Sequence, residues 1–306
     1  MPHFLTLGGL PAATLTSLLD ASAAYKRGRP HAPAPWLQGK TVAVVLEKAS
    51  TRTRVGFEVA IRELGGHAIV LTSAGSQLAR GEPVEDTARV LGRMCHGIVY
   101  RTFGDERLQR MASASGVPVV NALTDREHPC QIIADLLTVR ERLGTIDVRY
   151  AWIGDGNNVA VSWIHAAAAF GLSLTLACPA GYHPDPDAVA DARAAGAAVN
   201  VVADPVDAAR GADVIMTDVW ASMGQEEEAR ARAEAFRGYI VDDGLFVHAS
   251  GRAIALHCLP AHRGEEIAAT VLDGPRGLAI WDQAENRLHT HKAILELAFT
   301  GRALGA

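Results

Sequence analysis

The sequence predicts an α/β fold with two doubly wound parallel-sheet domains. Apolar runs of strand length alternate with segments of helical periodicity along the chain. The chain has 306 residues, which is enough for two domains that each bury a core. Chemically capable polar residues follow the expected strands, which is where open parallel sheets bind their ligands.

The first half of the chain contains four expected strands, at residues 41–47, 67–72, 97–101 and 117–122. Val55 to Leu64 has apolar residues at helical spacing and ends at Gly65-Gly66. Gly116 ends a further helix, and a long amphipathic helix is expected from His128 to Leu143. This order is typical of β-α units around a parallel sheet.

The second half repeats the pattern, with strands expected at 149–153, 173–178, 198–203, 213–218 and 253–258. An exposed, charged helix is expected over 226–236, and a final helix over 289–299 is expected to pack on the first half. The predicted domains are therefore 1–134 plus 288–306, and 135–287.

Composition excludes several classes of protein. Hydrophobic residues make up 49% and charged residues 21% of the chain, and the net charge of −5 comes without a basic block, so a nucleic-acid partner is not expected. The apolar stretches are too short for a membrane helix, and residues 1–10 do not resemble a secretory signal. Four scattered cysteines favour a reducing, cytoplasmic location over disulfides or zinc; they are Cys95, Cys130, Cys178 and Cys258.

The run Ser50-Thr51-Arg52-Thr53-Arg54 predicts an anion site. It lies between an expected strand and the helical segment that starts at Val55. Free backbone N–H groups, the helix dipole, hydroxyls and guanidinium groups all favour a phosphate there. Taken alone, the run would more often be a Ser/Thr helix cap followed by solvated arginines.

Six polar clusters follow six expected strands, which makes a chance arrangement of core residues a poor explanation. We expect them to line one site in a cleft between the two sheets. The clusters are Ser50 to Arg54, Arg101, His128 to Gln131, Gly154 to Asn158, Asp218 to Gly224, and His257 to Pro260.

These clusters resemble the aspartate/ornithine carbamoyltransferase family. Ser-Thr-Arg-Thr-Arg at 50–54 and His-Pro-Cys-Gln at 128–131 are similar to the carbamoyl-phosphate half that its members share. Asp218 to Gly224 and His257 to Pro260 resemble the ornithine carbamoyltransferase branch specifically. The resemblance extends from about residue 36 to about residue 292 and includes Ser76-Gln77-Leu78, 86–91 and Glu285-Asn286-Arg287.

The resemblance implies a reaction and a set of carbamoyl-phosphate contacts. The carbamoyl group would pass from carbamoyl phosphate to the δ-amine of L-ornithine, giving L-citrulline and phosphate, without a metal or cofactor. Arg101 would bridge phosphate and carbonyl oxygen, while His128 and Thr53 would polarise the carbonyl. The implied contacts are Ser50, Thr51, Arg52, Thr53, Arg54, Gln77, Arg101, His128, Gln131, Cys258, Leu259 (through its backbone carbonyl) and Arg287.

The ornithine half is expected to use Asn158, Asp218, Ser222 and Met223. Asp218 and Cys258 would orient the δ-amine and hold its proton balance, and which of them dominates stays open. By itself Cys258 would be a buried core thiol, and His128 and Arg101 would each more often be structural. The implied catalytic residues are Arg101, His128, Asp218 and Cys258.

The loop at 73–83 carries Gln77, which in the family reaches a neighbouring subunit's site and so implies a homotrimer or a multiple of trimers. Four further histidines show no metal-ligand spacing tied to carboxylates and are read as structural: His248, His262, His289 and His291.

Three rival functions stay in view. A sister transferase could use putrescine or N-acetylornithine, although putrescine lacks the carboxylate that Ser222-Met223-Gly224 would receive. Gly154-Asp155-Gly156 after a strand is a weak dinucleotide signal, because Val159 stands where the third small residue belongs. An inactive homologue would lack catalytic positions that are present here. Arginine biosynthesis and arginine breakdown are both open, as is assembly beyond a trimer.

Overall fold

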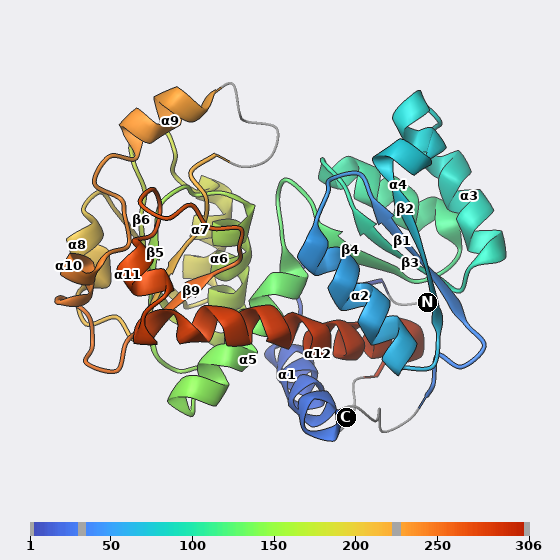
Figure 1. Cartoon of the computed structure of the whole chain (residues 1–306), viewed down its shortest axis with the longest axis horizontal. Helices are drawn as coiled ribbons and strands as arrows, with labels where there is room; N and C mark the ends of the chain where they lie inside the picture. Colours follow the sequence, from blue (N-terminus) through green and yellow to red (C-terminus); the bar gives the residue numbers. More distant parts are fainter. Residues whose placement is uncertain (1–2, 30–34, 222–227, 303–306) are drawn as a thin grey trace. The chain divides into compact units, whose positions relative to one another are not determined.

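The computed structural model describes residues 3–29, 35–221 and 228–302, and the chain divides into two compact units. Unit 1 contains residues 1–134 and 285–306, and unit 2 contains residues 135–284. The boundaries fall within two helices, α5 (Pro129–Leu143) and α12 (Leu278–Thr300). Figure 1 shows the elements of both units.

Unit 1 is built on a four-stranded parallel sheet in the order β2-β1-β3-β4. Parallel neighbours need crossover connections, and helices supply them. The strands are β1 (Thr41–Leu46), β2 (His67–Thr72), β3 (Gly97–Arg101) and β4 (Val119–Leu123). The helices are α1 (Ala12–Gly28), α2 (Thr51–Glu63), α3 (Val84–Met94) and α4 (Asp105–Ser115), with short 3₁₀ turns at Ser73–Gly75 and Gln77–Arg80.

The two faces of the unit 1 sheet are covered by different helices. Ala43 and Val45 of β1 belong to a buried cluster with residues of α3 and α4, which lie side by side (Figure 1). Because strand side chains alternate, Val44 belongs to the opposite face. Helix α2 packs against β1 and β2, and its Phe57 stacks on His291 of α12 with ring centroids 3.7 Å apart.

Unit 2 is built on a five-stranded parallel sheet in the order β7-β6-β5-β8-β9. Its strands are β5 (Arg149–Ile153), β6 (Ser173–Ala177), β7 (Ala198–Val202), β8 (Val214–Thr217) and β9 (Ile254–His257). Its helices are α6 (Asn158–Phe170), α7 (Pro186–Ala194), α8 (Pro205–Ala209), α9 (Ala229–Ala235), α10 (Asp243–Phe246) and α11 (Ala269–Leu272), with a 3₁₀ turn at Pro275–Gly277.

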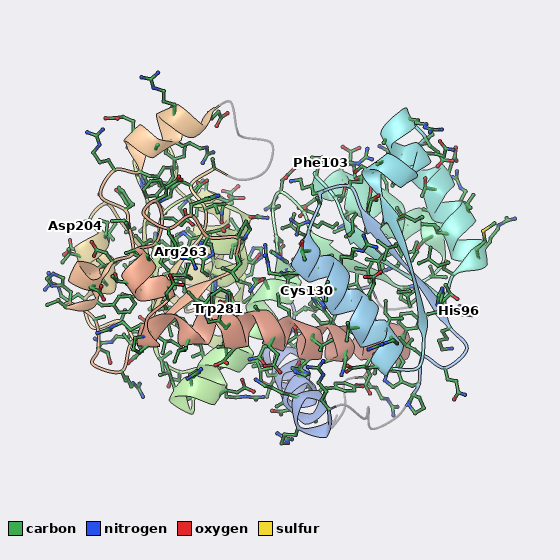
Figure 2. The ribbon with its side chains drawn as sticks, viewed as in Figure 1. His96, Phe103, Cys130, Asp204, Arg263 and Trp281 are labelled. Carbon is green, nitrogen blue, oxygen red and sulfur yellow. The ribbon has the colours of Figure 1, made fainter. Side chains whose placement is uncertain are left out.

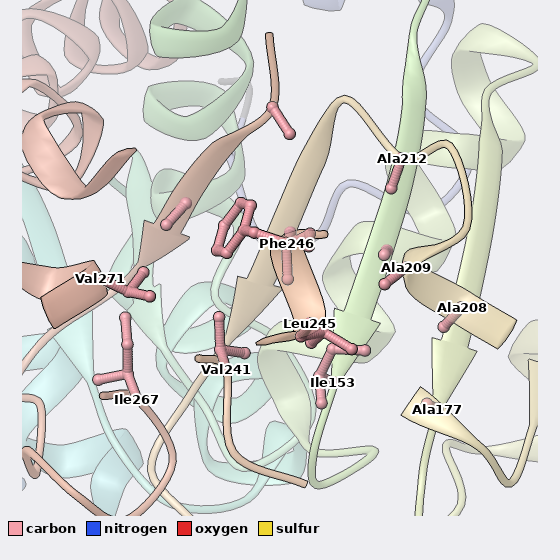
Figure 3. Close-up of a cluster of buried hydrophobic side chains, with 14 of the residues drawn as sticks. Ile153, Ala177, Ala208, Ala209, Ala212, Val241, Leu245, Phe246, Ile267 and Val271 are labelled. Carbon is pink, nitrogen blue, oxygen red and sulfur yellow. The ribbon is translucent and has the colours of Figure 1, made fainter. Parts of the chain in front are cut away.

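Strand β5 shows how the core of unit 2 is divided. Ile153 belongs to a buried cluster with Val241, Leu245 and Phe246, which Figure 3 shows beside the strands. Tyr150, of the opposite parity, packs against Trp163 of α6 with ring centroids 4.9 Å apart. The alternating side chains of one strand therefore contribute to an apolar layer on each face of the sheet, which is the arrangement of a doubly wound sheet.

The predicted α/β class with two parallel sheets is confirmed, and the starts of two helices are corrected. Helix α2 begins at Thr51 rather than Val55, because Ser50 caps it. Helix α12 begins at Leu278 rather than at residue 289. Helix α1 was not predicted at all. Of the predicted helix at 226–236, residues 226 and 227 lie outside the described part of the chain, and α9 covers Ala229–Ala235.

The described helices were also compared with the requirements of a membrane span. None of those within residues 3–29, 35–221 and 228–302 combines the length and apolar character needed to cross a bilayer.

Close contact between α3 and α4 generates a stability prediction. A Cβ on Gly92 of α3 would lie 1.7 Å from the backbone oxygen of Ser115, which cannot move without shifting α4. Gly92→Ala should therefore lower the free energy of unfolding by about 3 kcal/mol, the upper end for overpacking. Urea unfolding would measure it. Gly28→Ala is the matched control, because no described atom lies within 4 Å of its Cβ position, and equal behaviour of the two variants would contradict the prediction.

Candidate functional site

Both units place their chemically capable residues at a reversal of strand order. In unit 1 the chain moves from β1 to β2 on one side and to β3 on the other, and in unit 2 it moves from β5 to β6 and later to β8. Crevices form at the carboxyl ends of the strands at such reversals, and ligands bind there. Each unit therefore carries a set of candidate site residues, described here as half-site 1 (unit 1) and half-site 2 (unit 2).

The N-terminus of α2 is the framework of half-site 1. Ser50 caps the helix, since its Oγ accepts a hydrogen bond from Thr53 N at 3.3 Å and lies 3.1 Å from Thr53 Oγ1. Thr51 is exposed at the first helical position. The first turn of a helix has unsatisfied N–H groups and the positive end of the dipole, so an anion is stabilised here.

Two buried arginines contribute positive charge to half-site 1. Arg287 of α12 donates from Nη2 to Thr53 Oγ1 at 2.9 Å, and both side chains are buried. Arg101 ends β3, where the register with β4 shifts between Tyr100 and Arg101, and its residue is 8% exposed. The shift leaves Ala122 of β4 without a partner on β3, an irregularity of the kind common beside functional sites.

His128 comes immediately before α5, and it is buried and held neutral. Burial lowers its pKa well below the ordinary value, and the charges of Arg287 and Arg101 lower it further. A neutral imidazole can donate a hydrogen bond without being an acid, which is the state required to polarise a carbonyl.

The first turn of α5 carries the neighbours of His128. Gln131 is buried there, and its backbone N–H donates to His128 O at 3.0 Å. Cys130 (Figure 2) is buried too, and burial raises the pKa of its thiol to about 12. Its Sγ donates to Asn121 O at 3.2 Å, so this cysteine is a packing residue.

Two other predicted contacts in unit 1 have exposed side chains. Arg54 is exposed and pairs with Glu58 one turn along α2 at 3.4 Å, while Arg52 is partly buried. Gln77 is exposed at the start of its 3₁₀ turn, which the capping Ser76 Oγ fixes by accepting from Leu78 N at 3.1 Å. Leu78 anchors the turn in the apolar cluster of unit 1.

Glu47 is a support residue that the sequence reasoning missed. It directly follows β1, and its carboxylate accepts hydrogen bonds from Tyr100 (2.9 Å), Thr102 and Arg107. Burial alone would raise the pKa of Glu47, but these hydrogen bonds outweigh it and lower the pKa. Because Tyr100 and Thr102 flank Arg101, this network fixes the backbone that carries the arginine.

Half-site 2 centres on Asp218, which follows β8. Its Oδ2 accepts from Asn157 Nδ2 at 2.8 Å, and its Oδ1 accepts from Cys258 Sγ at 3.0 Å. Asn157 also caps α6 by accepting from Val159 N and Ala160 N. Three different strand ends thus converge on one carboxylate, and two of the predicted site residues, Asp218 and Cys258, are in contact.

The predicted ornithine contacts are only partly placed. Asn158 is the first residue of α6 and is partly exposed. Ser222 and Met223 lie outside the described residues. The neighbouring Asn157 was not predicted as a site residue, although its position immediately after a strand was a usable signal.

A buried ion pair supports the segment before Ser222. Arg232 of α9 donates from Nη1 to Asp155 Oδ2 at 2.6 Å and to Trp220 O at 2.9 Å, and its guanidinium carbon lies 4.9 Å from the centre of the Tyr182 ring. Burial raises the pKa of Asp155, while Arg232 opposes the rise. The sequence reasoning missed this pair, because 77 residues separate its members.

His257 organises the segment that follows β9. Its Nδ1 accepts from Leu259 N at 2.8 Å, and its Nε2 lies 3.2 Å from Glu266 Oε1, so the proton belongs on Nε2. Leu259 has φ +59°, a conformation that a leucine seldom adopts, and it precedes a cis peptide bond to Pro260. The hydrogen bond to His257 helps to hold this backbone, whose carbonyl was predicted to contact substrate.

The geometry disfavours the dinucleotide alternative. Gly156 N donates to Tyr182 O at 2.9 Å, and a Cβ on Gly156 would lie 2.2 Å from Pro184 N. This glycine therefore accommodates another stretch of backbone. The dinucleotide fingerprint instead needs its glycines to face a pyrophosphate.

Comparisons with known proteins agree over most of the chain. The family model described as "Aspartate/ornithine carbamoyltransferase, carbamoyl-P binding domain" matches residues 2–141, and the one described as "Aspartate/ornithine carbamoyltransferase, Asp/Orn binding domain" matches residues 146–298. An ornithine carbamoyltransferase of Acidothermus cellulolyticus is 58% identical over 96% of this chain and 95% of its own length.

Solved structures give the same result. The anabolic ornithine carbamoyltransferase of Campylobacter jejuni is similar with a TM-score of 0.93 and 38% identity, covering 99% of this chain and 100% of its own. The enzyme of Pyrococcus furiosus has a TM-score of 0.90 and 44% identity, covering 98% and 97%.

The neutral state of His128 generates a pH prediction. Its folded pKa is lowered, so below about pH 6.5 the unfolded chain binds a proton that the folded chain does not, and stability falls as the pH falls. His128→Gln should remove one such proton and reduce the slope of unfolding free energy by about 1.4 kcal/mol per pH unit below that point.

Urea unfolding from pH 8 to pH 5 would measure this slope. The difference in unfolding free energy between the variant and the wild type at pH 8 is the internal control, because at that pH it reports only the change in packing. His291→Gln should act in the same way, since burial and Arg287 also lower the pKa of His291 well below its ordinary value. Parallel pH profiles for wild type and both variants would contradict the prediction.

Proposed function

Because the chain belongs to the aspartate/ornithine carbamoyltransferase family, we propose that it transfers the carbamoyl group of carbamoyl phosphate to the δ-amine of L-ornithine, giving L-citrulline and phosphate. The observation that carries this proposal is the match of both family domains to almost the full chain. We assign carbamoyl phosphate to the predicted domain 1–134 plus 288–306, and ornithine to 135–287.

Half-site 1 suits carbamoyl phosphate in charge and in hydrogen bonding. The phosphate lies at the N-terminus of α2, with contacts from Ser50, Thr51, Arg52, Thr53 and Arg54. Support comes from the Ser50 cap and from the buried contact between Arg287 and Thr53. An anion there gains from backbone N–H groups, the helix dipole and guanidinium charge together.

Chemistry at the carbamoyl carbon needs a stabilised carbonyl oxygen. Nucleophilic attack places negative charge on that oxygen, and Arg101 and neutral His128 donate to it, with Thr53 beside them. Gln131 accepts from the carbamoyl NH₂, and the Leu259 carbonyl does the same. Removing one donor of this kind typically slows an enzyme by about 100-fold to 1000-fold. Phosphate then leaves with the electron pair of the broken C–O bond.

The amine nucleophile belongs to half-site 2. Asp218 accepts from the δ-amine and orients it, while Cys258, which donates to Asp218, is the adjacent acid–base group. Attack by the neutral amine releases one proton as the C–N bond forms. Asn158, Ser222 and Met223 receive the α-amino and carboxylate end, and this contact distinguishes ornithine from putrescine.

A citrulline-forming assay across amine acceptors, with phosphate release measured in parallel, tests the reaction directly. Ornithine should give equal amounts of citrulline and phosphate, whereas putrescine and N-acetylornithine should give little of either. Faster turnover with one of the other amines would show that this amine, and not ornithine, is the acceptor.

We place the reaction in arginine biosynthesis in the cytoplasm. The solved relative from Campylobacter jejuni is named as an anabolic enzyme, which favours the biosynthetic direction. Comparing turnover in the two directions at physiological substrate concentrations tests this assignment, and a preference for citrulline phosphorolysis would overturn it.

We further propose a homotrimer in which Gln77 completes the site of a neighbouring subunit. Gln77 is exposed on a short turn that buried Leu78 anchors, so its side chain is held away from the core of its own unit. Sedimentation would show a mass of three chains or a multiple of three.

Mixing subunits gives a sharper prediction. Arg101→Ala and Gln77→Ala should each lose most activity alone, because each removes a contact to carbamoyl phosphate. When both are refolded together in equal amounts, about one quarter of sites should regain Arg101 from one subunit and Gln77 from the next, since a trimer interface is heterologous. A mixture of Arg101→Ala with His128→Gln, both acting in their own subunit's site, is the control and should stay inactive. No recovery in the first mixture would contradict the shared site.

Turnover should rise with pH across the neutral to mildly alkaline range, because only the neutral δ-amine attacks and its solution pKa is about 10.4. Cys258→Ser keeps the hydrogen bond to Asp218 but removes the thiol's acidity, so it should move this rise or lower its plateau. Affinity for carbamoyl phosphate, measured by calorimetry, should hardly change. An unchanged pH profile with unchanged ornithine affinity would leave Cys258 as a packing residue.

A further inference from the structure

His262, Glu265 and Glu266 form a compact group on the segment after Pro260. One candidate ligand atom from each residue, the His262 ring nitrogen and one oxygen of each carboxylate, lies within 4.8 Å of the other two. His262 and Glu265 are exposed, whereas the side chain of Glu266 is 0% exposed. The sequence analysis read His262 as structural because it found no metal-ligand spacing tied to carboxylates, although Glu265 and Glu266 follow it closely in the chain.

The turn is fixed by its own backbone. Glu265 N donates to His262 O at 3.0 Å, and Gly264 N donates to Ile267 O at 2.9 Å. His262 N donates to Glu266 Oε1 at 2.5 Å. The three side chains are therefore presented by a closed loop and lose little freedom on binding a ligand.

Glu266 Oε2 points to what this group binds. This oxygen is fully buried, and no residue within the described ranges donates a hydrogen bond to it. A buried carboxylate oxygen without a donor is costly, so it requires an explanation. The His262 ring lies next to this oxygen, with Nδ1 at 3.5 Å, which is too long for a good hydrogen bond between these two atoms.

That distance suits a shared cation. Ligands about 2.0–2.1 Å from a tetrahedral metal lie about 3.4 Å from one another, close to the spacing of Nδ1 and Oε2. Arg263, labelled in Figure 2, makes two hydrogen bonds to Asp273, at 2.9 and 2.7 Å. Its charge is thus already partnered by another carboxylate.

We propose that His262 Nδ1 and one carboxylate oxygen each from Glu265 and Glu266 bind a first-row divalent cation of the zinc type. One imidazole and two carboxylates are suitable ligands for such an ion, and they leave a fourth position for water. The site is distinct from the Asp218, His257 and Cys258 group, which also brings three potential ligands together but belongs to half-site 2.

The proposed site is coupled to half-site 2 through one side chain. Glu266 would bind the cation through Oε2, while its Oε1 lies 3.2 Å from His257 Nε2. His257 in turn accepts from Leu259 N, whose residue has the unusual φ of +59°. A cation that draws Glu266 toward His262 would therefore disturb the Leu259 backbone and slow turnover, an effect that rests on the proposed function.

Titration of the full, tag-free chain with Co²⁺ tests the site, because four-coordinate Co²⁺ absorbs visible light. Cys258→Ser serves as background to remove the competing thiol. In it we expect one bound Co²⁺ per chain, displaced by Zn²⁺. Adding His262→Ala or Glu265→Gln to this background should weaken the affinity for Co²⁺ by more than about 10-fold. Loss of even an outer-sphere partner can weaken metal binding by that factor. The matched controls are His248→Ala and Glu234→Gln, both exposed elsewhere in unit 2, and they should leave affinity unchanged.

Absence of Co²⁺ binding in the Cys258→Ser background would overturn the proposal, because the cation would then depend on half-site 2. Unchanged affinity in both His262→Ala and Glu265→Gln would overturn it as well. For the coupling, zinc should inhibit His262→Ala less than wild type, while the two turn over equally without metal. Equal inhibition would remove the coupling. A failure of metal-free wild type to form citrulline would instead count against the proposed function and leave the binding result intact.

Discussion

The reversal of strand order within each parallel sheet is the constraint on which both half-sites depend. At a reversal, neighbouring strands send their connections in opposite directions, so the ends of those two strands are free to carry side chains toward a ligand. In unit 2 this brings Asn157, after β5, within 2.8 Å of Asp218, after β8. In unit 1 it places the Ser50 cap of α2 and Arg101 at the ends of adjacent strands. The same topology thus yields an anion site in one unit and a carboxylate site in the other.

Buried supporting residues hold the functional ones in place. Glu47 collects three donors around the backbone of Arg101, Arg232 ties Asp155 to Trp220, and His257 restrains Leu259. None of these supports needs to touch a substrate, but a functional geometry is only as precise as the residues packed behind it. This is why the Asp155–Arg232 ion pair and the His257 imidazole are buried close to strand ends, although burial carries a desolvation cost.

The strands and the strand-end clusters could be predicted because a buried parallel strand is a short apolar run. The polar residues that directly follow such a run stand out in the sequence. Helix α12 was only half predicted, because its first half buries Gln283, Asn286 and Arg287, which mask the apolar period. Long-range support was also beyond reach: neither Asp155 with Arg232 nor Glu47 with Arg107 has a sequence spacing that signals contact. His262 and Glu266 have the i, i+4 spacing of neighbours on a helix, but they meet in a turn that follows β9.

Charge explains why the two substrates would not exchange half-sites. Half-site 1 keeps His128 neutral, through burial and the positive charge of Arg287 and Arg101, and the same conditions exclude an ammonium group. Half-site 2 presents a buried Asp218 with Asn157 and Cys258 as its donors, a setting that repels a phosphate dianion. Each set of residues therefore favours one substrate by its charge, independently of the shape of that substrate. An amine must lose its proton to react, and Asp218 can hold the acceptor amine until that proton leaves. Neutral His128 can then donate a hydrogen bond to the negative charge that forms on the carbonyl oxygen during attack.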